Sequence, residues 1–176
     1  MTEELLTEPP MAGTEIDTLL GTLERNRRTL EWKCADLDAA AMTISVGKSA
    51  ITLGGLLRHL TRCEASSFAS KLHDTKADPP WTPADWDRDW EWTAGDDTEE
   101  LWRGWHAAVE RSRVLVAQAM ADGGLERAKG REFPGYGVPS LRRILTDMIE
   151  EYARHLGHAD LIREAIDGRV GEDAPR

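Results

Sequence analysis

Apolar residues recur every three or four positions along four separate stretches of the chain, which is the spacing of amphipathic helices. The first stretch, 14–37, begins at Thr14, whose side chain can form a capping box with Asp17. The second stretch, 52–74, follows a segment rich in small residues and begins at Thr52, another helix-capping residue. Two long helices are therefore predicted in the first half of the chain.

Two further helices are predicted in the second half. The third begins near Thr98 and stops at the glycine pair 123–124, and the fourth begins at the capping residue Ser140 and ends at Gly168. Between the second and third helices, residues 75–97 combine three prolines and four tryptophans with acidic residues. Proline interrupts helices, so this segment is expected to be an ordered connection.

Four long helices with no alternating strand pattern predict an all-α protein. We expect a four-helix bundle in which residues 75–97 form a long crossover connection between non-adjacent helices. The bundle would occupy residues 14–168 as a single domain, with flexible tails at 1–13 and 169–176. A chain of 176 residues is long enough to bury one substantial core.

The charge of the chain narrows its range of partners. It carries 22 basic and 32 acidic residues, a formal net charge of −10, so we expect it to bind neither nucleic acid nor membranes. Both cysteines, Cys34 and Cys63, lie in apolar helical patterns, where a small buried hydrophobe is favoured over a nucleophile. Without a secretory or membrane-spanning pattern, a cytoplasmic location is expected.

Ionisable residues occupy positions that the helical pattern places on core-facing sides. Asp147, Glu151, His155 and His158 follow the apolar stripe of the last helix, and His59 lies on the inward side of the second helix. An unpaired carboxylate buried there would cost several kcal/mol, and a divalent cation would remove that cost. Three ligands, His59, Glu151 and His155, would leave coordination positions open, as catalytic metal sites do.

A purely structural interpretation has equal weight on spacing alone. Glu151 could pair with Arg154 or Arg143 at one end of the bundle, while His155 and His158 line an interface. The remaining histidines are expected at the surface: His73 and His106.

Two segments resemble the DinB-like superfamily, especially an actinobacterial branch of small proteins related to mycothiol-dependent maleylpyruvate isomerase. They are LGGLLRHLTRCE at 53–64 and IEEYARHLGHADLIRE at 149–164, and the likeness extends over about 16–168. The resemblance implies a bundle whose helix order differs from a simple up-down bundle. It also implies a divalent metal bound by one histidine of the second helix, matched by His59, and by two ligands one turn apart on the last helix.

The resemblance also bears on the other site residues. Much of the superfamily has a His-x-x-x-His pair on the last helix, whereas the isomerase relatives have Glu-x-x-x-His, matched here by Glu151 and His155. Many members of the branch carry histidine where this chain has Asp147. His158 stands where family members often have glutamine, so His158 and Asp147 are candidates for a fourth ligand or for supporting contacts.

The activity implied by this resemblance is transfer of a low-molecular-weight thiol, mycothiol or a similar compound, to a small electrophile at a divalent metal. Zinc is the first expectation for the metal, and nickel is the alternative. Arg58, Arg62 and Arg154 flank the inward positions and could hold the polar part of the thiol, although a solvated helix face is favoured for them. The segment from Trp81 to Trp92 could cover the substrate or simply pack on the bundle.

Two other functions stay open at this point. In a metal-dependent hydrolase, Asp147 or His158 would help to move protons at the open metal position. A non-enzymatic metal-binding stress protein would need neither a base nor a substrate pocket. Apart from a small-molecule substrate, a second copy of the chain in a homodimer is the partner to consider.

Overall fold

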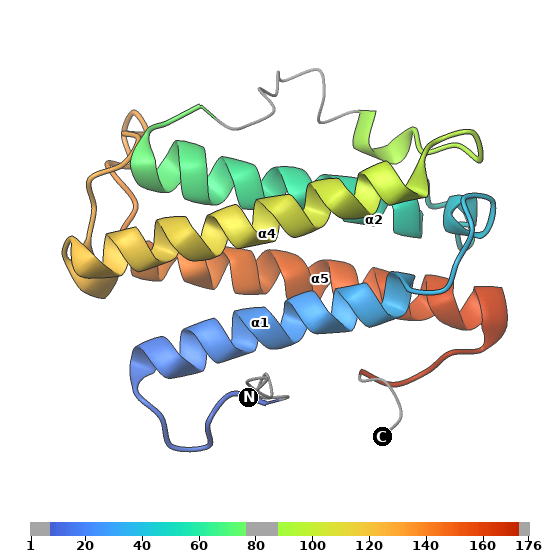
Figure 1. Cartoon of the computed structure of the whole chain (residues 1–176), viewed down its shortest axis with the longest axis horizontal. Coiled ribbons are helices and arrows are strands. Elements are labelled where there is room, and N and C mark those ends of the chain that lie inside the picture. The colour runs from blue at the N-terminus through green and yellow to red at the C-terminus, as the bar shows by residue number, and fades with distance from the viewer. Residues whose placement is uncertain (1–7, 77–87, 173–176) are drawn as a thin grey trace.

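A computed structural model of the chain describes residues 8–76 and 88–172. Four long helices lie side by side in it, and the described residues contain no β-strand, so the predicted all-α four-helix bundle is confirmed (Figure 1). The long helices are α1 (Glu15–Cys34), α2 (Leu53–Glu64), α4 (Thr98–Ala121) and α5 (Leu141–Asp167). α2 continues directly into a π-helix, η2 (Ala65–Lys71), and the connections contain shorter helical turns, η1 (Ala41–Thr43), η3 (Arg88–Trp90) and η4 (Gly124–Glu126).

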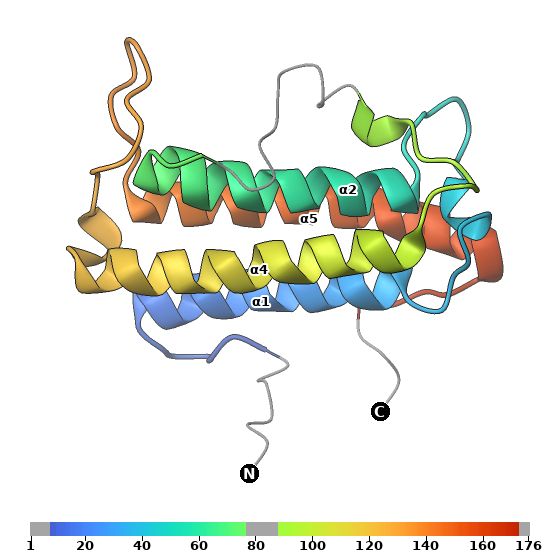
Figure 2. The ribbon, with the colours of Figure 1, turned by 45° about the horizontal axis from the view of Figure 1, so that its top comes forward.

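The helices are not arranged as a simple up-down bundle. Figures 1 and 2 show that α1 lies beside α5 and that α2 lies beside α4, with α2 also packed against α5. Followed along the chain, α1 and α5 run in one direction and α2 and α4 run in the other. Because α2 and α4 are parallel neighbours, the connection between them joins opposite ends of the bundle, which explains its length.

The predicted capping residues begin the helices. The Thr14 hydroxyl accepts from the Asp17 amide, and the Asp17 side chain in turn accepts from the Thr14 amide, which completes the capping box of α1. At the start of α2 the Thr52 hydroxyl accepts from the Gly55 amide, and at the start of α5 the Ser140 hydroxyl accepts from the Arg143 amide. Gly168 ends α5 with a φ of 78°, a left-handed conformation that glycine adopts without strain.

The predicted end of the first helix is wrong, because α1 ends at Cys34 and not at Leu37. Asp36 has a φ of 62°, outside the helical region. Arg163 of α5 is buried at this end, and its guanidinium donates to two carbonyl oxygens that the helix leaves without a partner, those of Lys33 and Ala35. Apolar periodicity alone cannot show a cap supplied by a distant helix.

Two glycines at the start of α2 allow the segment after the crossover to lie directly on this helix. A Cβ atom on Gly54 would come within 2.4 Å of the Trp92 ring. One on Gly55 would come within 3.0 Å of the Asp89 carbonyl oxygen. Trp92 is therefore packed into the core, whereas the positions of Trp81 and Trp86 lie outside the described residues.

The acidic side chain of Glu64 on α2 is fully buried in the core. Its carboxylate accepts two hydrogen bonds from Arg27 of α1, at 2.8 and 2.7 Å. It also accepts one from the Tyr152 hydroxyl of α5 at 2.8 Å, and that hydroxyl accepts from the indole N–H of Trp105 on α4 at 3.2 Å. One carboxylate thus connects all four long helices.

No helix in the described part of the chain is both long enough and apolar enough to span a membrane. Each instead turns one apolar side to the shared core, which includes Leu23, Leu30, Leu56, Leu60, Phe68, Val109, Val116, Ile144, Leu145 and Ile162.

The buried carboxylate leads to a prediction about stability. Glu64→Gln should lower the free energy of unfolding by about 3 kcal/mol, because it leaves the Arg27 guanidinium buried without its full counter-charge. The matched control is Glu150→Gln, which removes an exposed pair with Arg154 and should change stability by less than about 0.5 kcal/mol. Urea unfolding followed by circular dichroism measures both, and equal midpoints for the two variants would contradict the prediction.

Candidate metal centre

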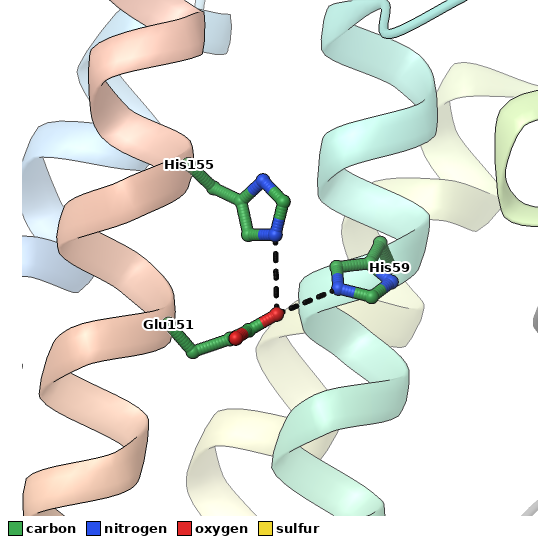
Figure 3. A group of neighbouring side chains, drawn as sticks. All are labelled: His59, Glu151 and His155. Carbon is green, nitrogen blue, oxygen red and sulfur yellow. Dashed lines mark hydrogen bonds and ion pairs between the residues drawn. The ribbon is translucent and has the colours of Figure 1, made fainter.

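Three side chains of kinds that can bind metals meet between α2 and α5, which face each other as antiparallel neighbours (Figure 3). His59 comes from α2, and Glu151 and His155 come from successive turns of α5. Glu151 Oε1 lies 2.9 Å from His59 Nε2 and 3.1 Å from His155 Nε2. One potential ligand atom from each residue lies within 4.8 Å of the other two. The structure thus brings together the three residues predicted from the sequence.

A buried carboxylate, that of Asp89, contacts His59 on the side of the ring away from Glu151. Asp89 of η3 is fully buried, and its Oδ2 lies 3.0 Å from His59 Nδ1. Its other oxygen pairs with the buried guanidinium of Arg62 at 2.6 Å. A carboxylate at Nδ1 fixes the orientation of the ring and leaves Nε2 to face the site, an arrangement common for histidines that bind metals.

An indole ring covers one side of the two imidazoles. Trp90 stacks on His59 with ring centroids 5.1 Å apart and lies 6.1 Å from the ring of His155. Trp90 follows Asp89 directly in the chain, so the same short turn supplies both the carboxylate and the aromatic wall. An apolar wall limits water at this side and strengthens the electrostatic interactions within the site.

The two residues predicted to support the site lie in different surroundings. His158 Nδ1 is 3.3 Å from Nδ1 of His155, on the side of that ring away from Glu151. Asp147 is half-exposed and pairs with Arg143 at 2.6 Å. The contact of His158 is thus with a candidate ligand, whereas the ion pair of Asp147 is with a surface residue.

The ionisation of the site follows from these contacts. Burial lowers the pKa of His59, but its hydrogen bonds with Asp89, Cys63 and Glu151 outweigh burial and raise this pKa to about 11. Hydrogen bonds from His155 and His59 hold the pKa of Glu151 well below its usual range. Without a metal, His59 therefore carries a proton and Glu151 a negative charge at neutral pH. A cation can replace that proton.

The geometry and chemistry of the three donors fit a divalent metal. Two nitrogen atoms and a carboxylate oxygen are common zinc ligands, with bonds of about 2.0–2.2 Å. Such ligands lie about 3.4 Å apart around a tetrahedral ion. The observed separations of 2.9 and 3.1 Å need only a small opening of the site. His59 and His155 would then bind through Nε2 and Glu151 through Oε1.

A small cavity of about 210 Å³ adjoins the site between α2, η2 and α5. It is lined by His59, Cys63, Ser66, Ser67, Lys71, Asp147, Met148 and Glu151. Lys71 and the two serines supply a positive charge and hydroxyl groups beside the proposed ligands. This cavity is large enough for part of a small polar molecule.

The alternative ion pairs considered for Glu151 are not formed. Arg154 pairs with Glu150, and Arg143 pairs with Asp147. Both arginines lie on the outer side of α5, away from the contacts that Glu151 makes with the two histidines. The described contacts of Glu151 are therefore with the two histidines and not with either arginine.

The three arginines proposed to hold a thiol do not lie at the site. Arg58 and Arg62 line a separate groove of about 690 Å³ between α2 and α4, and Arg154 is exposed on α5. The groove lies on a different side of α2 because positions 58 and 62 are rotated by about 100° from 59 and 63. Lys71 is the basic residue that lines the cavity beside the proposed ligands.

Sequence reasoning missed Asp89, set Cys63 aside, and indicated Trp90 only as part of the segment from Trp81 to Trp92 that could cover the substrate. Asp89 and Trp90 lie in the irregular segment after the crossover, where no periodicity indicates which side chains turn inward. Cys63 fits the apolar stripe of α2 and was set aside for that reason, yet its sulfur lies 3.4 Å from His59 Nε2. Its position four residues after His59 was the one available signal.

The remaining histidines lie outside this cluster. Nε2 of His73 donates to the Leu115 carbonyl oxygen, 2.9 Å away, and His106 is an exposed residue of α4 near Glu31. Neither lines the 210 Å³ cavity.

The fold and the site together define a class: an all-α bundle with a His/Glu/His cluster able to hold a metal between two antiparallel helices. The model of the mycothiol S-transferase family matches residues 18–168, most of the chain. The chain therefore belongs to this family, and the expected resemblance to the DinB-like branch is confirmed. No curated protein and no solved structure matches the chain.

The position of Asp89 predicts an effect on metal affinity. Asp89→Asn should weaken zinc binding by about 10-fold to 100-fold, because His59 loses the charge that orients it. Asp147→Asn changes a carboxylate of the same size on the exposed pair with Arg143 and should weaken binding less. Competition with a chromophoric chelator gives both affinities, and equal losses would contradict the orienting role of Asp89.

The raised pKa of His59 predicts a pH dependence. Since the proton stays on this ring up to a pKa of about 11, an ion that binds at Nε2 must displace it at any lower pH. Zinc affinity should therefore keep rising, by about tenfold per pH unit for each proton released, between about pH 6 and pH 9. With an imidazole of ordinary pKa at this position, the zinc affinity would level off above about pH 6.5. Zinc titrations at a series of pH values distinguish the two behaviours.

Proposed function

We propose that this protein is a metal-dependent thiol S-transferase, which joins mycothiol or a similar low-molecular-weight thiol to a small electrophile. One observation carries the proposal: a chain that belongs to the mycothiol S-transferase family brings His59, Glu151 and His155 together as a potential metal site. Zinc suits this mixed nitrogen and oxygen donor set, and nickel is the alternative.

A bound zinc ion would lower the pKa of a coordinating thiol and so supply a thiolate at neutral pH. The protein side chains prepare this chemistry. Glu151 brings a negative charge that offsets the charge of the ion, and its two histidine neighbours hold that carboxylate in place. Asp89 keeps Nε2 of His59 aimed at the site, and His158 can do the same for His155 through the contact between their Nδ1 atoms.

The cavity beside the cluster offers a place for the polar part of the thiol. Lys71 can pair with a carboxylate, and Ser66 and Ser67 can bond to hydroxyl groups, as a sugar-containing thiol requires. On the other side, Trp90 presents an apolar surface that suits the electrophile.

A hydrolase needs a base that can reach water at the site, and the two candidates have other contacts. Asp147 pairs with Arg143, and the Nδ1 atom of His158 is directed to His155. These contacts favour the transferase over the hydrolase. A small molecule is the proposed substrate. Analytical sedimentation would show whether two copies of the chain form a homodimer.

The transferase proposal predicts metal-dependent consumption of a thiol. Zinc-loaded protein should accelerate the reaction of mycothiol with monochlorobimane or an activated haloarene, and metal-free protein should not. His155→Ala should abolish this rate because it removes a ligand, whereas His106→Ala, an exposed histidine, should leave it unchanged. Glu151→Gln should lower both metal content and rate.

The assay should include other thiols and a simple ester. Metal-dependent hydrolysis of the ester, without turnover of any thiol, would replace the transferase proposal by the hydrolase. Full metal occupancy with neither reaction would support a binding protein.

A further inference from the structure

We propose that Cys63 is a fourth protein ligand of the metal centre, an inference that rests on the metal-dependent function proposed above. Its sulfur lies 3.4 Å from Nε2 of His59 and 3.9 Å from Oε1 of Glu151. These are the same two atoms that would bind the ion. Cys63 therefore meets the cluster on its ligand side, and not at the back of a ring.

These separations match those expected around a tetrahedral ion. With a zinc–sulfur bond of about 2.3 Å and a zinc–nitrogen bond of about 2.1 Å, the sulfur and nitrogen atoms lie about 3.6 Å apart. The sulfur of Cys63 is already within a few tenths of an ångström of this value from both His59 and Glu151. The Cys63 sulfur lies outside the group of donor atoms that are all within 4.8 Å of one another, so it must move closer to His155 for all four donors to surround one ion.

The backbone supports the same conclusion. Cys63 follows His59 by one helical turn on α2, just as His155 follows Glu151 by one turn on α5. Two pairs of ligands thus face each other across the interface between antiparallel helices. This is the usual way in which helical bundles build metal sites from side chains on facing helices.

The surroundings of Cys63 favour a ligand over simple packing. The residue is 8% exposed and lines the cavity together with His59 and Glu151, so the sulfur faces polar groups at one edge of the core. The other cysteine, Cys34, is fully buried near the end of α1, outside this cavity. It provides a matched control within the same chain.

A cysteine ligand would change which metal ion the centre prefers. A thiolate joined to two imidazoles and a carboxylate favours zinc over magnesium or calcium, which prefer oxygen ligands. It also fills the position that three protein ligands leave open. A thiol co-substrate would then take the place of Cys63, and the proton that this thiol loses would pass to the Cys63 sulfur, so that the charge at the site stays the same.

Cobalt(II) tests this ligand directly, because a cobalt-bound thiolate absorbs in the near ultraviolet by charge transfer, whereas nitrogen and oxygen ligands do not. The full chain, freed of added thiols, is loaded with cobalt(II). We expect the charge-transfer absorption together with the visible ligand-field bands of a tetrahedral site. Cys63→Ala should lose the charge-transfer absorption, and Cys34→Ala should keep it.

Zinc affinity provides a second measurement. Cys63→Ala should bind zinc more weakly by on the order of 100-fold, while Cys34→Ala binds as the unchanged protein does. Circular dichroism spectra show whether both variants fold. If Cys63→Ala does not fold, Cys63→Ser replaces it, because serine changes the shape of the side chain less.

Different outcomes overturn different parts of the proposal. Ligand-field bands without charge transfer in the unchanged protein, or charge transfer that persists in Cys63→Ala, would reject Cys63 as a ligand and leave the His/Glu/His centre intact. Failure of the unchanged protein to bind either zinc or cobalt would reject the metal centre itself, and with it the proposed function.

Discussion

The rest of the structure depends on the buried carboxylate of Glu64, which links all four long helices. It accepts hydrogen bonds from Arg27 of α1 and Tyr152 of α5, and the Tyr152 hydroxyl accepts one from Trp105 of α4. Apolar side chains can pack in several registers with similar energy, whereas a buried charge tolerates only the register that satisfies it. This interaction therefore selects one arrangement of the helices.

The register matters because the proposed metal ligands are neighbours of the same network. Cys63 directly precedes Glu64 on α2, and Glu151 directly precedes Tyr152 on α5. A slip of one residue along either helix would rotate its side chains by about 100° and separate the donors. The polar core of the bundle and the chemistry at its α2–α5 interface are thus parts of one constraint.

Features that recur with the period of a helix could be predicted from the sequence. Features that arise from contacts between distant segments could not. The periodic apolar stripes and the capping residues Thr52 and Ser140 indicated α2 and α5 correctly. The four-residue spacing of Glu151 and His155, together with the family resemblance, indicated the cluster. The end of α1 was wrong because Arg163, far along the chain, supplies the cap.

The surroundings of the cluster show the same limit at the level of single residues. Asp89 lies in a segment without periodicity, and its approach to His59 depends on the two glycines at the start of α2. Arg58 was considered as a contact of the thiol, although a solvated helix face was favoured, and it lies in the groove between α2 and α4. A helical pattern indicates that a residue lies on an inner side of its helix, but not which neighbouring helix it faces.

Charge balance makes a proton and the proposed metal alternative occupants of this site. The carboxylates of Asp89 and Glu151 both contact His59, and the buried Arg62 offsets only the first of them. A second positive charge is therefore needed beside Glu151, and a protonated His59 supplies it when no ion is bound. A divalent cation supplies more charge at the same point and can draw in one further anionic donor. A thiolate, whether from the chain or from a co-substrate, meets that requirement at the edge of the cluster where the cavity opens.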